Sequence, residues 1–77
     1  MKFTEHEITR DLVSGEPAPR LILRAGCGVV ALVVDVVPCS PGGVPVFHMQ
    51  WDMWLELDDV KAAMDLAHEW MKGISNA

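Results

Sequence analysis

The chain has 77 residues, of which 51% are hydrophobic and 22% are charged, and its formal charge at pH 7 is −5. A chain of this length holds one domain and has no room for a doubly wound nucleotide-binding fold or an enzyme barrel. Its hydrophobic content excludes intrinsic disorder, because disordered chains lack the aliphatic residues that build a core. We therefore expect a single α+β domain over residues 1–77, small enough to gain stability from a partner chain.

The first element is predicted to be a helix that begins at Thr4. Thr4 and Glu7 have the spacing of a capping box, and Phe3 and Ile8 occupy the positions of a hydrophobic staple. A strand is the alternative, but it would place the charged Arg10 on the same face as Ile8 and so break the alternation of a half-buried strand. The local signals favour the helix.

Three strands are predicted next, over residues 20–25, 29–37 and 44–54. Two prolines mark residues 15–19 as a turn, because proline cannot continue a helix and lacks the donor that a central strand needs. The glycines of segment 26–28 suit a tight hairpin connection. Six of the nine residues in 29–37 are valine, which is typical of a strand buried on both faces. Residues 38–43, rich in proline and glycine, are predicted to form a loop.

The last element is predicted to be a helix. Carboxylates follow Glu56 in the expected first turn, Lys72 falls in the last turn, and Gly73 suits the position after the helix end. Apolar residues recur at helical spacing and form the expected buried stripe: Val60, Ala63, Met64, Ala67, Met71 and Ile74. The predicted order is α-β-β-β-α, with a three-stranded antiparallel sheet packed against the C-terminal helix.

The valine-rich strand has two apolar faces, and both need to be covered. One face carries Val29, Ala31, Val33 and Val37, and the other carries Val30, Leu32, Val34 and Val36. The long helix covers one face, and either the first helix or a second copy of the chain covers the other. We expect a homodimer and assign self-association to Val30, Leu32, Val34 and Val36.

The third predicted strand also sorts its side chains by face. Phe47, Met49, Trp51 and Met53 share one face and are expected in the core under the helix, whereas His48, Gln50, Asp52 and Trp54 share the other. Trp54 among polar residues is typical of the aromatic anchors of recognition surfaces. The alternative is a tryptophan that lies flat over the sheet edge.

Negative charge is concentrated after residue 51. Residues 52–77 carry six acidic and two basic side chains, a net charge of −4. Such a surface repels phosphates, so direct nucleic-acid binding is not expected, but it suits a protein partner with a basic surface. A solvated helix face is the alternative interpretation. The predicted partner-binding residues are Asp52, Trp54, Glu56, Asp58, Asp59, Asp65 and Glu69.

No residue pattern indicates catalysis, a metal site or a cofactor. Cys27 and Cys39 lie too far apart along the predicted strand for a disulfide and are read as free thiols. The histidines and cysteines show no paired zinc-ligand spacing, and no carboxylate is placed to orient a dyad of Cys39 and His48. The Gly-x-Gly-x-x-Ala match at residues 26–31 precedes a β-branched run rather than a helix. The N-terminus lacks an apolar signal region and no segment is long enough to span a membrane, so we expect a cytoplasmic protein.

In size, acidity, α+β make-up and lack of catalytic residues, the whole chain resembles the small phage-encoded anti-CRISPR proteins. The resemblance is one of type, rests on no shared motif and assigns no residue. It implies a non-enzymatic inhibitor that binds a basic, nucleic-acid-binding surface of a host protein complex.

Two alternatives to the inhibitor are considered. Strands followed by the segment 57–63 look like the ending of HicB-like antitoxins, which would make the chain an antitoxin or a small dimeric regulator; it lacks an appended basic DNA-binding segment. A small enzyme using Cys39 or a histidine is the third class, and no residue pattern supports it.

Overall fold

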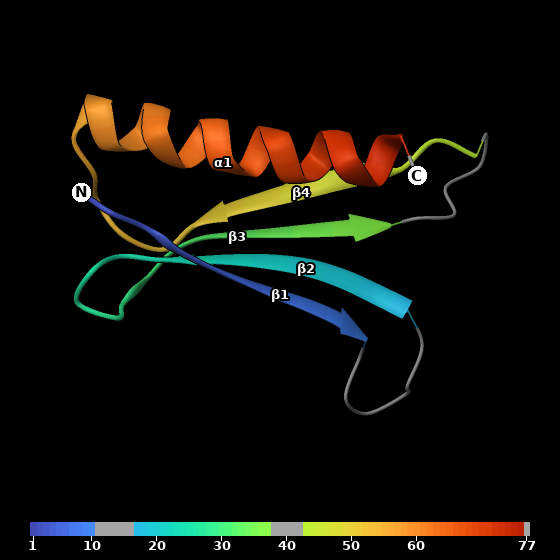
Figure 1. Cartoon of the computed structure of the whole chain (residues 1–77), viewed down its shortest axis with the longest axis horizontal. Helices are drawn as coiled ribbons and strands as arrows, with labels where there is room; N and C mark the ends of the chain where they lie inside the picture. Colours follow the sequence, from blue (N-terminus) through green and yellow to red (C-terminus); the bar gives the residue numbers. More distant parts are fainter. Residues whose placement is uncertain (11–16, 38–42, 77) are drawn as a thin grey trace.

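The computed structural model of the chain describes residues 1–10, 17–37 and 43–76. These residues form one four-stranded antiparallel sheet followed by one helix, and the strands are arranged in the order β1-β2-β3-β4 (Figure 1). The α+β class and the C-terminal helix are confirmed, but the three-stranded sheet and the N-terminal helix are not. The elements are β1 (Thr4–Arg10), β2 (Pro17–Arg24), β3 (Val30–Val37), β4 (Val46–Trp51) and α1 (Leu57–Ser75).

The predicted first helix is strand β1, which is the main correction to the sequence analysis. β1 pairs with β2 from Thr4 opposite Arg24 to Arg10 opposite Pro17. A capping box stabilises a helix by about 1 kcal/mol, whereas pairing gives the main chain of β2 a second partner and shields its side chains. The long-range ladder therefore overrides the local signal. Residues 17–19, predicted to be in a turn, are instead the start of β2.

The hairpin between β2 and β3 matches the sequence prediction. The main-chain amide of Gly28 donates to the carbonyl of Ala25 over 2.8 Å, and the amide of Ala25 donates to the carbonyl of Val29 over 2.8 Å. Gly28 has a φ of 91°, a conformation that is costly for other residues. The predicted loop at 38–43 lies outside the described residues except for Gly43.

The core lies between α1 and one face of the sheet. Leu21 and Leu23 of β2 lie opposite Val34 and Leu32 of β3, and all four are at most 2% exposed. From α1, the residues Ala63 and Ala67 complete this buried cluster. Partly buried side chains surround it: Phe3, Phe47, Met49, Leu66, Trp70 and Met71. The predicted positions of Phe47 and Met49 against the core are thus confirmed, although both are only partly buried. Trp51, predicted on the same buried face, is 38% exposed, and Met64 of the predicted stripe is also exposed.

Because alanine lets α1 approach the leucines of the sheet closely, a larger side chain at Ala67 should be costly. We expect Ala67→Leu to lower the free energy of unfolding by about 1–3 kcal/mol through overpacking. The neighbouring His68 is exposed, and His68→Leu should change it by less than about 0.5 kcal/mol. Urea unfolding followed by circular dichroism measures both, and equal effects would contradict the packing described.

Candidate functional site

The connection between β4 and α1 presents an exposed tryptophan. Trp54 is 99% exposed and lies among Trp51, Asp52 and Met53, with which it lines a shallow depression of about 400 Å³. The main-chain amide of Asp52 still donates to the carbonyl of Ala31 over 2.8 Å, so the sheet pairing continues to the start of this connection. The alternative of Trp54 lying flat over the sheet edge is excluded by its exposure.

The predicted acidic residues are divided between the start of α1 and its outer face. Glu56 is the N-cap residue, although its side chain forms no capping hydrogen bond, and Asp58 and Asp59 lie in the first turn. Asp59 is the less available of these, because its carboxylate accepts a hydrogen bond from the N-terminal ammonium of Met1 over 3.0 Å. Glu56 and Asp58 are exposed beside the Trp54 connection.

The outer face of α1 has mixed charge rather than uniformly acidic charge. Asp58, Asp65 and Glu69 fall on one side by their helical spacing, and Lys61 and Lys72 share that side. The ammonium of Lys72 lies 3.7 Å from the carboxylate of Glu69. The unbalanced charge of the predicted site therefore lies at the N-terminal end of the helix, around Trp54.

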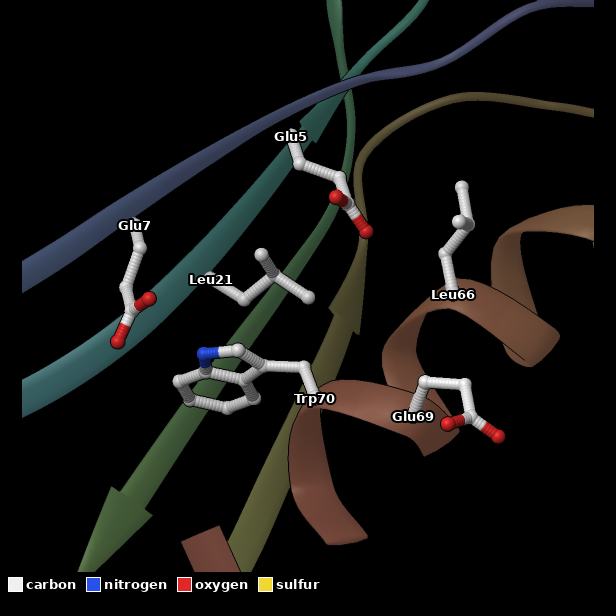
Figure 2. Close-up of a pocket in the computed structure, with 6 residues that line it drawn as sticks. All are labelled: Glu5, Glu7, Leu21, Leu66, Glu69 and Trp70. Atoms are coloured by element: carbon white, nitrogen blue, oxygen red, sulfur yellow. The ribbon is translucent and has the colours of Figure 1, made fainter. Parts of the chain in front are cut away.

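A second acidic surface, which the sequence analysis missed, lies between β1 and α1. It is a groove of about 460 Å³, and we call it the β1–α1 groove. Leu21, Leu66 and Trp70 supply its apolar surface, and Glu5, Glu7 and Glu69 supply carboxylates. Figure 2 shows Glu5 and Glu7 reaching from β1 toward the helix, which carries Leu66, Glu69 and Trp70. The lining thus contains three carboxylates and no basic side chain.

Trp70 gives this groove an unusual polar group. Its ring packs edge-on against Phe47 of β4, with centroids 6.3 Å apart and planes at 70°. Its Nε1 is buried and has no hydrogen-bond partner among the described residues. In Figure 2 the nitrogen is on the side of the ring that faces Leu21 and the strands, the side from which Glu7 enters. A buried donor without an acceptor lowers the stability of the fold by about 1–3 kcal/mol.

The signal for this groove was present in the sequence but was assigned to another element. Glu5 and Glu7 are two residues apart, which places them on one face of a strand, here the face toward α1. On the predicted helix they would have been 200° apart around the axis and would not have shared a surface. The helical interpretation of residues 4–10 therefore concealed the site.

The residues assigned to self-association are covered by the chain itself, which corrects their predicted availability. Leu32 and Val34 are 0% exposed beneath α1, and Val36 is also buried. Only Val30 of the four is partly exposed. Among the described residues, no element covers the face of the sheet away from α1, where Ile8, Ile22 and Val33 are half-buried.

The face of the sheet away from α1 also carries polar residues. Arg20 and Asp35 lie opposite each other on β2 and β3, and Arg20 Nε donates to the carboxylate of Asp35 over 2.6 Å. His6 and His48, on the edge strands β1 and β4, are exposed. This face therefore combines an apolar centre with polar residues around it.

The structure describes only part of the residues named in the thiol and metal predictions. Cys27 is a free, exposed thiol, and Cys39 lies outside the described residues. Within residues 1–10, 17–37 and 43–76, no group of three or more His, Cys, Asp or Glu side chains is arranged to hold a metal ion. The glycine pattern at 26–31 leads into strand β3 and not into a helix, as expected.

No helix in the described part of the chain is both long and apolar enough to cross a membrane. Comparisons with models of protein families, with curated proteins and with solved structures find no match to this chain.

The burial of Leu32 can be tested against the alternative that its face binds a second copy. We expect Leu32→Ala to lower the free energy of unfolding by about 2–5 kcal/mol and to leave the sedimenting mass of the folded protein unchanged. Leu57→Ala is the control, because Leu57 is 74% exposed and its truncation should cost less than about 0.5 kcal/mol. A changed mass at unchanged stability would show that Leu32 lies at an interface between copies.

Proposed function

We propose that the protein is a non-enzymatic, cytoplasmic interaction module that inhibits a host complex by binding its basic, nucleic-acid-binding surface, in the manner of anti-CRISPR proteins. The observation that carries this proposal is Trp54, which is fully exposed beside carboxylates at the start of α1. An exposed tryptophan gives a partner a large apolar surface to bury, and tryptophan is enriched among residues that dominate binding energy.

The charges around Trp54 favour a basic partner. Asp52, Glu56 and Asp58 are exposed within four residues of Trp54, and no basic residue lies between 52 and 60. The carboxylates offer a basic surface the negative charge that nucleic-acid phosphates ordinarily supply to it, and they accelerate association at low ionic strength. The binding site of this proposal consists of Asp52, Trp54, Glu56 and Asp58, with Asp59, Asp65 and Glu69 at its periphery.

Affinity capture with matched variants tests this site. The tagged protein is incubated with nuclease-treated lysate, and bound proteins are identified by mass spectrometry. We expect a basic nucleic-acid-binding protein that added DNA or RNA displaces. Both Trp54→Ala and the double variant Glu56→Gln/Asp58→Asn should lose at least about 90% of it, since loss of a hot-spot residue weakens binding by 2 kcal/mol or more.

The control is Val46→Lys/His48→Lys, which changes the net charge by the same two units on the exposed side of β4. It should retain the captured protein. Recovery that is insensitive to Trp54 and to the helix-start carboxylates, or recovery of no basic protein, would contradict the proposed function.

A HicB-like antitoxin is the second candidate function, because the sheet is followed by a C-terminal helix, as in the ending of those proteins. For either function we propose a homodimer. Sedimentation equilibrium at micromolar concentration should then give the mass of two chains, and the mass of one chain would contradict the dimer.

A further inference from the structure

The β1–α1 groove has the charge of a site for a cation. Neither Glu5 nor Glu7 has an ion-pair or side-chain hydrogen-bond partner among the described residues. Glu69 at the opposite wall is partly balanced by Lys72. The carboxylates of β1 are therefore the unbalanced charges of a groove whose volume, about 460 Å³, falls in the usual range for ligand sites.

The indole of Trp70 favours an arginine side chain as the cation that binds in the β1–α1 groove. An arginine side chain fits this wall because its planar guanidinium stacks on aromatic rings while its five donors reach carboxylates. A metal ion or a polyamine lacks this planar group, whereas a peptide brings it together with main-chain groups.

The β1 wall also suits an extended peptide. Among the described strands, β1 lies at the edge of the sheet and pairs only with β2, so its outer edge presents main-chain groups to which a further strand can bind. Glu5 and Glu7 are about 7 Å apart along the strand, which is the spacing of alternate residues in any extended segment. A peptide aligned with β1 therefore places arginines at alternate positions beside both carboxylates.

We propose that the β1–α1 groove and the free edge of β1 form a docking site for an extended, arginine-containing segment of a protein partner. Arginine side chains bind the carboxylates of Glu5 and Glu7 and stack against the accessible part of the Trp70 ring. The inference rests on the proposed function, protein binding, and adds a contact separate from Trp54.

Fluorescence anisotropy with a labelled peptide of alternating arginine and serine tests the proposal. Glu5→Gln/Glu7→Gln should weaken binding about tenfold, since each exposed charge pair contributes roughly threefold. The matched control is Val46→Lys/His48→Lys, which changes the net charge by the same two units on the sheet face away from α1 and should change the affinity less than about twofold. Equal weakening by the two double variants would show nonspecific attraction to net charge and would overturn the proposal.

Two further measurements test the peptide-specific part. Trp70→Leu keeps an apolar side chain and removes the ring on which the guanidinium stacks, so it should weaken binding about threefold; unchanged affinity would overturn the assigned stacking. Spermidine should compete poorly with the peptide at equal charge concentration. Competition as strong as that of unlabelled peptide would show that any polycation suffices and would overturn the choice of a peptide.

A direct readout keeps the proposal testable if the Glu5/Glu7 double variant does not fold. In Trp51→Phe/Trp54→Phe, Trp70 is the sole tryptophan, and its emission should change on addition of the peptide. An unchanged emission at peptide concentrations that saturate the anisotropy signal would place the peptide elsewhere. If the lysate partner is lost only with the Trp54 variants, and the peptide binds independently of Glu5 and Glu7, the groove fails while the proposed function stands.

Discussion

The close contact of α1 with the centre of the sheet determines the rest of the structure. Ala63 and Ala67 have no side chain beyond Cβ, so the helix axis lies near the leucines of β2 and β3, which are removed from water. A domain of 77 residues has little other apolar surface to bury, and this one contact supplies most of its core. It also leaves the opposite face of the sheet without a covering layer among the described elements.

Both candidate binding surfaces follow from the position of this helix. The start of α1 follows β4 after a short connection, and that connection leaves Trp54 exposed beside carboxylates. Farther along, Leu66 and Trp70 face β1, whose carboxylates project from the same side of the sheet as the core leucines. Charged residues on an edge strand discourage pairing between identical chains, and Glu5 and Glu7 lie on such a strand.

Some of this architecture could be predicted from single-residue patterns. Carboxylates at the start and Lys72 near the end identified α1, and alternation in residues 46–51 placed Phe47 and Met49 in the core. The identity of β1 could not be predicted, because Thr4 and Glu7 satisfy a helix cap locally, whereas the strand depends on their pairing with Arg24 and Leu21 of β2. Nor could the covered face of β3, because Leu32 and Val33 are equally suited to burial. The β1–α1 groove can be recognised only when β1 is known to be a strand and the covered face of β3 is known, so the sequence did not reveal it.

Trp70 is held against the sheet with its indole N–H buried, whereas the side chain of Trp54 is exposed to solvent. Hydrogen exchange of the three indole N–H groups, followed by NMR in the free protein, measures this difference directly. We predict that Trp54 exchanges at the rate of an unprotected indole and that Trp70 is strongly protected by the packing of α1. Exchange of Trp70 as fast as that of Trp54 would contradict this prediction and show that the helix does not pack as described.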